Sequence, residues 1–461
     1  MCVAASLALA AVILSGATQV ETWSPEAVSG RTDWFAVLLR GEQVGYLRVA
    51  YRREADAYVL DNRMELRGKA QGTEFHQVQE ERFRFALTPP YGVRSGRMSQ
   101  RQDDALASVQ EFDNEADALQ FRAGGKARPE RLPRSSLTFS DILAPMAWVA
   151  AGNATLPLRS RFWDWEQRAD GTESYRLLNR GPEAVDLEQT STGTQLKAHM
   201  RFALDGAPLS LELGSALTLR RTDEAGALAY KASTDLYFGG GVPVDKTLGS
   251  ARLVQRLVLA VSLPSGATIP SAAGQESHAG QVVLRRPVQG EPVSPEARKA
   301  ALVVDARLGG QSPELMRLAQ QAVDGARTPR EQVLKLTAFV AEYLEDAPVL
   351  QAVTADELRQ QRRGDCTEHT QLFTALARRL GIPTREVAGL VYLGDSLRRF
   401  GGHAWAEVEL DGRWQAVDPT WNEFGVDATH IRFGEGKDGE ESLFLMQDGM
   451  RFTVLDVGYA D

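Results

Sequence analysis

The chain has few cysteines, no excess of positive charge and no long apolar run. Its 461 residues include only 2 Cys, which excludes a scaffold held by several disulfides. Its 52 basic residues are outnumbered by 61 acidic ones, for a net charge of −9, which argues against nucleic acid as the main partner. A composition of 43% hydrophobic and 25% charged residues is ordinary for a globular protein. Disorder as the main state and a multi-span membrane protein are therefore both disfavoured.

The first 20 residues are predicted to be a signal peptide or a membrane anchor. Val3–Leu14 is apolar except for Ser6, and its length of about 12 residues matches a signal-peptide core and falls short of a membrane span. Ser15-Gly16-Ala17 offers small residues for cleavage, although no Lys or Arg precedes the apolar run. A buried N-terminal helix is the alternative interpretation. We expect an exported protein of the periplasm or cell envelope, in contact with the membrane only if this segment is retained.

Residues 31–265 are predicted to form a β-rich region of one or two domains. Short β-prone runs alternate there with turn residues such as Asp61-Asn62 and Asp205-Gly206, which is typical of antiparallel sheet. A short helix is expected at Ser140–Ala151. Nothing in this region identifies a chemistry, although it offers a place for an envelope ligand. The expected strands are Trp34–Leu39, Tyr46–Tyr51, Tyr58–Leu66, Phe75–Phe85, Leu196–Phe202, Leu209–Arg220 and Ala229–Phe238.

The chain changes character after this region. Residues 266–295 are rich in Gly, Ser, Pro and Ala and are predicted to be a linker to a domain at 296–461. Apolar residues then recur with helical spacing, and helices are expected to start at Ser312, Thr328 and Thr354.

Cys366 is the residue with the clearest chemical potential. It follows Asp365 and opens a predicted helix, Cys366–Leu380, which Gly381 ends. Unpaired N–H groups and the positive end of the helix dipole stabilise a thiolate in such a first turn, and the thiolate is the nucleophilic form of cysteine. If Cys2 is lost by cleavage after residue 17, Cys366 is the only cysteine left, and an unpaired thiol in an exported protein calls for an explanation.

A predicted hairpin presents a histidine and an aspartate together. Phe400–Leu410 and Arg413–Asp418 are expected strands joined by Asp411-Gly412, a strong signal for a two-residue turn. If Leu410 faces Arg413, His403 and Asp418 lie diagonally on one face of the sheet, about 7–8 Å apart at Cα and close enough for a hydrogen bond. A cysteine nucleophile, a histidine base and an orienting carboxylate are the parts of a catalytic triad.

These motifs resemble the core of the transglutaminase-like superfamily, over roughly residues 290–435. The resemblance implies a papain-like α+β fold at the C-terminus, preceded here by the large antiparallel β-rich region, and a triad of Cys366, His403 and Asp418. Bacterial members with export signals include predicted peptidases. The matching tracts are Gly364-Asp365-Cys366, Gly381-Ile382-Pro383, His403-Ala404-Trp405-Ala406-Glu407-Val408, Asp418-Pro419-Thr420 and Asp427-Ala428-Thr429-His430-Ile431.

The chain departs from the animal enzymes of this superfamily at the oxyanion site. No Trp lies between Trp165 and Cys366, where those enzymes place one. Gln360 and Gln361 are alternative oxyanion donors, and the backbone N–H of Cys366 is a further donor. No run resembles an animal-type calcium site, so no cofactor is implied.

Other interpretations of the same residues remain open at this point. Cys366, His369, His403 and Asp418 could form a metal site, although they already fit a triad. His369 is otherwise expected to support the triad or to face a partner, and His430 to be structural or to line the cleft.

The leading hypothesis for function is a cysteine-dependent acyl-transfer enzyme acting on protein or peptide amides. We expect hydrolysis rather than crosslinking. The alternative is a catalytically silent envelope protein that binds a ligand or serves as a scaffold.

Overall fold

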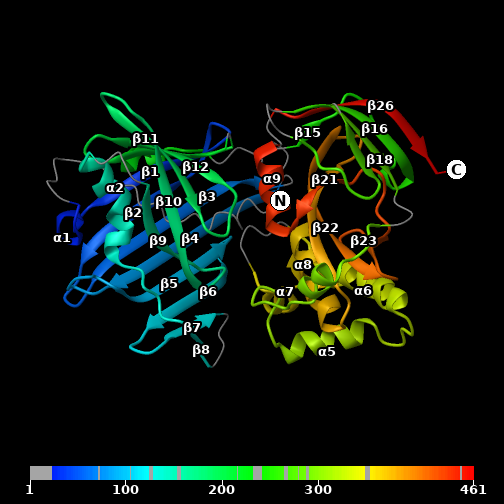
Figure 1. Cartoon of the computed structure of the whole chain (residues 1–461), viewed down its shortest axis with the longest axis horizontal. Coiled ribbons are helices and arrows are strands. Elements are labelled where there is room, and N and C mark those ends of the chain that lie inside the picture. The colour runs from blue at the N-terminus through cyan, green and yellow to red at the C-terminus, as the bar shows by residue number, and fades with distance from the viewer. Residues whose placement is uncertain are drawn as a thin grey trace. The chain divides into compact units, whose positions relative to one another are not determined.

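The computed structural model describes residues 23–460, except 71–72, 104, 124–127, 153–156, 215, 232–240, 264–267, 279, 287–289, 348–352 and 447–448. The chain forms two compact units that divide between residues 236 and 237. We call the described residues before this division the β unit and those after it the C-terminal unit (Figure 1). The predicted signal segment, residues 1–20, lies outside the described residues. Within the described part of the chain, no helix is long and apolar enough to cross a membrane.

The β unit is built on one 14-stranded antiparallel sheet. The strands β1 to β8 and β9 to β14 each run in sequence order, and pairing of β1 with β14 joins the two series into one sheet. This confirms the prediction of antiparallel structure. The strands are β1 Thr32–Leu39, β2 Glu42–Arg53, β3 Tyr58–Ala70, β4 Thr73–Phe85, β5 Val93–Gln102, β6 Ala105–Asn114, β7 Leu119–Ala123, β8 Glu130–Leu132, β9 Leu158–Asp164, β10 Ala169–Arg180, β11 Ala184–Ser191, β12 Lys197–Ala203, β13 Pro208–Leu213 and β14 Leu217–Thr222.

Aromatic side chains hold the two ends of this sheet together. Phe112 of β6 lies 4.5 Å, between ring centroids, from Trp163 of β9, and Phe83 of β4 lies 5.7 Å from Trp165. The sheet therefore curves until strands far apart in its order share one aromatic core. Three short helices accompany it: α1 Pro25–Val28, α2 Phe139–Ala150 and α3 Glu224–Leu228.

Two details of the predicted strands differ from the structure. The run 209–220 is two strands, β13 and β14, because Gly214 takes a positive φ of 59° and turns the chain between them. The run 229–238 lies mostly outside the described residues, and its first residues, 229–231, are not in a strand.

The predicted linker at 266–295 is instead part of the C-terminal unit. It contains β17 (Gln275–His278) and β18 (Gln281–Arg285), and β18 pairs with β16 (Val254–Ser262). On its other edge β16 pairs with β26 (Arg451–Tyr459), close to the end of the chain. Local composition indicates the turns of this segment, but it does not show that β18 pairs with β16, or that β16 is itself held by a strand almost 200 residues later in the chain.

The C-terminal unit combines helices with a second antiparallel sheet of order β24-β23-β22-β21-β25, onto which β15 pairs at β22. Together with the β unit, it makes the chain β-rich with a papain-like α+β region at its C-terminal end, as expected. Its remaining elements are β15 Val242–Pro243, the 3-10 helix η2 Ala251–Leu253, α4 Pro295–Ala300, α5 Pro313–Ala322, α6 Pro329–Tyr343, β19 Glu345–Asp346, α7 Ala355–Gln361, β20 Arg363–Gly364, α8 Cys366–Arg379, β21 Thr384–Tyr392, β22 Arg399–Leu410, β23 Arg413–Asp418, β24 Glu423–Phe424, β25 Ile431–Glu435 and α9 Gly436–Met446.

The helix α8 is the central element of this unit. Its residues Leu372, Phe373 and Leu376 are fully buried and pack in one core with Ala406 and Val408 of β22 and with apolar residues of α5, α6 and α7. Burying several large apolar side chains in this way, at about 1.5–3 kcal/mol each, fixes α8 against the sheet. The first residue of α8 is thereby held at a defined place beside β22.

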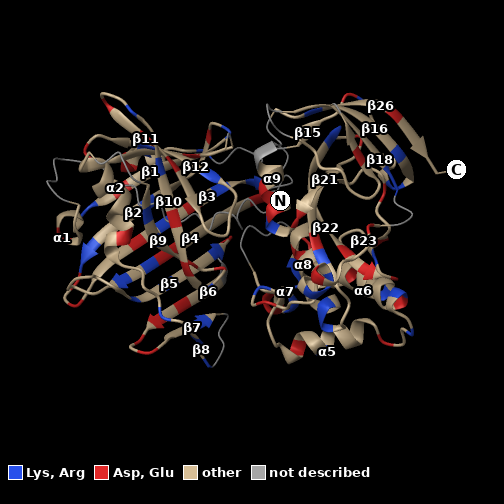
Figure 2. Cartoon of the chain, in the orientation of Figure 1, with Lys and Arg blue, Asp and Glu red and all other residues tan. Residues whose placement is uncertain are grey.

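Charged residues of both signs are interspersed along the strands of both units (Figure 2). Many are paired across strands, as Arg63 is with Glu80 and Arg97 with Glu111.

The turn between β22 and β23 offers a test of the hairpin. Asp411 and Gly412 have φ values of 52° and 77°, which β-branched residues adopt only with strain. We predict that Gly412→Val lowers the free energy of unfolding by roughly 1–2 kcal/mol or more, whereas Asp411→Asn is neutral, because Asn tolerates this conformation. Urea unfolding of both variants measures the difference. Equal stability of Gly412→Val and wild type would contradict the account of the turn.

Candidate active site

Cys366 is the first residue of α8, as the sequence predicts. Asp365 caps the helix: its Oδ1 accepts a hydrogen bond from the Thr367 N–H at 2.9 Å, and the Glu368 carboxylate accepts one from the Asp365 N–H, also at 2.9 Å. This reciprocal pair is a capping box, and it fixes the position at which the helix begins. Cys366 is 4% exposed, and within the described residues it is the free cysteine.

Two acidic residues close to Cys366 in the sequence have buried side chains. Asp365 and Glu368 are 5% and 2% exposed. Burial, together with the nearby Asp365 carboxylate, raises the pKa of Glu368 well above its ordinary value. The neutral form of Glu368 is thereby favoured, which lowers the cost of placing a second acidic side chain next to Cys366.

The hairpin has the predicted register. Leu410 pairs with Arg413, and the ladder continues to Ala406 and Val417. The side chains of His403 and Asp418 meet as expected: the His403 Nε2–H donates to Asp418 Oδ2 at 2.8 Å. Asp418 Oδ1 accepts a second hydrogen bond, from the Thr420 N–H at 2.8 Å, so both carboxylate oxygens are held.

His403 is kept in its charged form by its neighbours. Burial opposes a charge on the ring, but the Asp418 carboxylate and Cys366, which also hydrogen-bonds to the ring, outweigh burial and raise the pKa of His403 to about 10. In turn, His403 holds the pKa of Asp418 well below its usual range, although burial acts in the opposite direction.

Two tryptophans complete the surroundings of His403. The Trp421 ring stacks on it, with centroids 4.4 Å apart and planes 11° from parallel, and Trp405 lies 6.2 Å away at 23°. Aromatic faces attract a cationic ring and exclude water from it. Nothing in the local spacing of the sequence shows that residue 421 returns onto residue 403.

The structure places His430 next to the triad. Its Nε2 lies 3.5 Å from Asp418 Oδ2, and its Nδ1 lies 3.3 Å from Asp427 Oδ1. Burial opposes charging of this ring too, but hydrogen bonds to Asp418 and Asp427 raise the pKa of His430 to about 9.

Three other residues singled out in the sequence lie elsewhere. His369 is 1% exposed, and its Nδ1 lies 2.8 Å from the carbonyl oxygen of Asp365. It supports the start of α8 and does not face a partner. Gln360 and Gln361 are exposed in the last turn of α7, and no contact among the described residues joins either of them to Cys366 or His403. The structure therefore gives no support to either one as an oxyanion donor, because α7 continues to Gln361 and directs both side chains to solvent.

The residues with metal-like spacing also differ from the set that the sequence suggested. The ligand atoms of His403, Asp418 and His430 lie within 4.8 Å of one another, so the cluster with metal-like spacing includes His430 and not His369. These atoms already contact one another through Asp418 Oδ2. Cys366 is not one of the residues of this cluster among those that the structure describes. We interpret the cluster as a hydrogen-bonded network.

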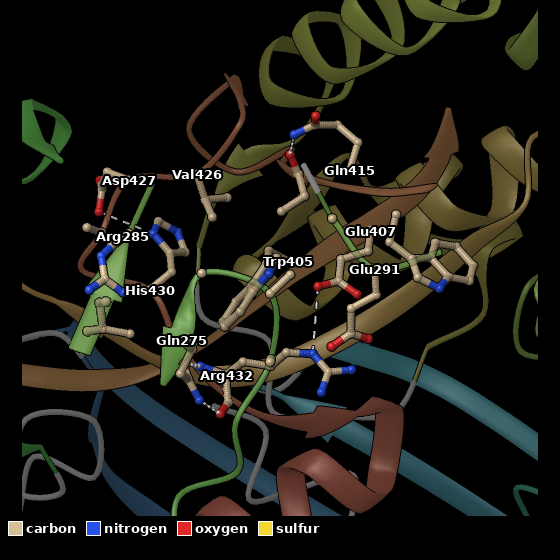
Figure 3. Close-up of a pocket in the computed structure, with 18 of the residues that line it drawn as sticks. Gln275, Arg285, Glu291, Trp405, Glu407, Gln415, Val426, Asp427, His430 and Arg432 are labelled. Atoms are coloured by element: carbon tan, nitrogen blue, oxygen red, sulfur yellow. Dashed lines mark hydrogen bonds and ion pairs between the residues drawn. The ribbon is translucent and has the colours of Figure 1, made fainter. Parts of the chain in front are cut away.

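A pocket that is partly open to solvent adjoins this network (Figure 3). Trp405, Asp427 and His430 form part of its wall, and Arg385 and Arg432 reach it from β21 and β25. Arg385 is paired with Glu407 at 2.6 Å, and its guanidinium lies 4.3 Å from the centre of the Trp414 ring. The pocket thus offers aromatic surface and both signs of charge next to the triad.

Comparison with known families agrees with this geometry. Residues 316–419, within the C-terminal unit, match the model of the transglutaminase-like superfamily. The match begins in α5 and ends one residue after Asp418, so it includes Cys366, His403 and Asp418. A search of curated proteins finds no match to the chain.

Three solved structures resemble the chain weakly. A Cytophaga hutchinsonii protein provisionally assigned as a cysteine protease is 16% identical, with 45% of this chain and 89% of that one covered and a TM-score of 0.30. A β-barrel-like protein from Brucella abortus, of a domain family of unknown function, is 8% identical, with coverage of 42% and 97% and a TM-score of 0.32. A Parabacteroides distasonis protein provisionally assigned as a protease is 14% identical, with coverage of 79% and 70% and a TM-score of 0.22. These scores are too low to transfer any property to this chain.

The capping box before Cys366 can be tested by two substitutions at one position. Because burial raises the pKa of Glu368 and so favours its neutral form, we predict that Glu368→Gln, which keeps shape and hydrogen bonding, changes the free energy of unfolding by less than about 1 kcal/mol, whereas Glu368→Ala costs roughly 1–3 kcal/mol. Thermal and urea unfolding measure both. A larger loss for Gln than for Ala would show that residue 368 acts as a buried charge.

The raised pKa of His403 predicts how stability depends on pH. Its folded value, about 10, lies above the ordinary 6.5, so its contribution is complete below about pH 6.5 and is lost as pH rises through about 10. Removing the carboxylate with Asp418→Asn should therefore destabilise the protein more at pH 6 than at pH 10.5. Urea unfolding of both proteins at the two pH values measures this. The same difference at both pH values would mean that the ring is not held charged.

Proposed function

We propose that the chain is a cysteine-dependent acyl-transfer enzyme that cleaves peptide or amide bonds through Cys366, His403 and Asp418. One observation supports this above all: a buried histidine is held by a carboxylate and also hydrogen-bonds to a cysteine. A protonated ring at this place stabilises the anionic form of the sulfur. The superfamily match over these residues is independent support.

The proposed reaction follows from these contacts. The Cys366 sulfur attacks the carbonyl carbon of the substrate, and negative charge develops on the carbonyl oxygen. The backbone N–H of Cys366, which as the first helical N–H has no partner within α8, is a donor for that charge. His403 then gives its proton to the leaving amine as the C–N bond breaks and a thioester forms. His403 next takes a proton from water, the resulting hydroxide attacks the thioester, and the acid leaves while the sulfur is regenerated.

We favour hydrolysis over crosslinking for two reasons. Water is abundant in the cell envelope, where the N-terminal segment is expected to direct the protein, and no crosslinking-specific feature stands out in the sequence. The adjoining pocket is a place where part of a peptide substrate binds next to the triad. The envelope ligand proposed for the β unit remains a separate proposal, and so does a non-catalytic scaffold role.

Labelling of Cys366 distinguishes the enzyme from the scaffold. We predict that an iodoacetamide probe at neutral pH modifies the Cys366 peptide, read by mass spectrometry, at least about tenfold faster in wild type than in His403→Gln, because the imidazolium favours the reactive thiolate. Cys366→Ala removes the signal, and His278→Gln, which changes an exposed histidine of β17, leaves the rate unchanged. Equal rates in wild type and His403→Gln would favour the scaffold role.

A further inference from the structure

His430 is a second buried imidazole on the carboxylate that orients His403. Asp418 Oδ2 accepts from His403 Nε2 at 2.8 Å and lies 3.5 Å from His430 Nε2. The two rings are 5.7 Å apart and inclined at 67°, so they approach the same oxygen from different directions. The His430 side chain is 1% exposed and that of Asp418 is 0% exposed.

The other ring nitrogen of His430, Nδ1, is also held in place. It lies 3.3 Å from Asp427 Oδ1, and that oxygen also accepts from the Thr429 N–H at 2.8 Å and from the Thr429 hydroxyl at 2.7 Å. Trp405 packs its edge against His430 at 5.2 Å and 88°. The ring therefore has little freedom to leave Asp418.

We propose that His430 is a positioning residue, which shares Asp418 Oδ2 with His403 and thereby sets how strongly that carboxylate holds the catalytic ring. This inference rests on the proposed function of the triad. Its consequence is electrostatic: a positive charge on His430 takes up part of the Asp418 charge and repels a positive charge on His403. Within this network the buried carboxylates of Asp418 and Asp427 each lie next to an imidazole.

Other charged side chains face this network and also influence how the two imidazoles share the charge of Asp418. Glu423 of β24 carries a pKa raised by burial and by Asp427, and it is paired with Arg252 at 3.1 Å. Arg285 and Arg432 line the pocket wall that His430 shares. None of these side chains lies in contact with Asp418 Oδ2 in the way that the two imidazoles do.

The test is the protonation of His403 in protein with ¹⁵N-labelled histidine, followed by NMR. The chain has 6 His, few enough to assign by substitution. We expect His430→Gln, which keeps an N–H donor toward Asp418 and removes the charge, to raise the titration midpoint of His403 by at least about half a pH unit. His278→Gln is the matched control and should leave the midpoint unchanged. An unchanged midpoint in folded His430→Gln would overturn the proposal.

If His430→Gln fails to fold, the titration of the wild-type protein tests the proposal without a variant. Because the two rings share one carboxylate, the His403 signals should shift in two steps, the first coinciding with loss of the His430 proton. A single step that does not coincide with His430 would contradict the proposal. Neither readout needs turnover. If the two rings titrate together but Cys366 is unreactive, the proposed enzyme activity is refuted. The proposed positioning role of His430, acting through Asp418, would still stand.

Discussion

The structure around the triad depends on one buried carboxylate. Asp418 has no exposed surface, and a charge there is costly unless it is fully paired. Its pairing with His403, with the Thr420 N–H and with His430 meets that requirement. The need to satisfy Asp418 therefore fixes the orientation of His403, and a fixed His403 is what gives Cys366 a proton partner.

The rest of the C-terminal unit holds these parts in place. The capping box at Asp365 sets where α8 begins, and the apolar face of α8 sets how it lies on β22. The turn at Asp411-Gly412 sets the register that brings β23 alongside. Loss of any one of these local features would disturb the relative placement of Cys366, His403 and Asp418, on which the proposed function depends.

The sequence predicted the features that depend on neighbours along the chain. A helix starting at Cys366 and a hairpin with Leu410 opposite Arg413 both follow from short motifs, and the structure contains both. Prediction from the sequence did not anticipate contacts between segments that lie far apart along the chain. Trp421 stacking on His403, His430 reaching Asp418 and β26 pairing with β16 each depend on tertiary contacts without a local pattern. Gln360 and Gln361 were proposed by spacing alone, and α7 directs them to solvent.

The central claim is that Asp418 keeps His403 protonated beside Cys366, and ¹⁵N NMR of the His403 ring in the wild-type protein tests it most directly. The account predicts that both ring nitrogens carry protons at pH 8 and that the ring titrates near the value of about 10 that its neighbours impose. A neutral ring at pH 8, with a midpoint close to the ordinary 6.5, would contradict it.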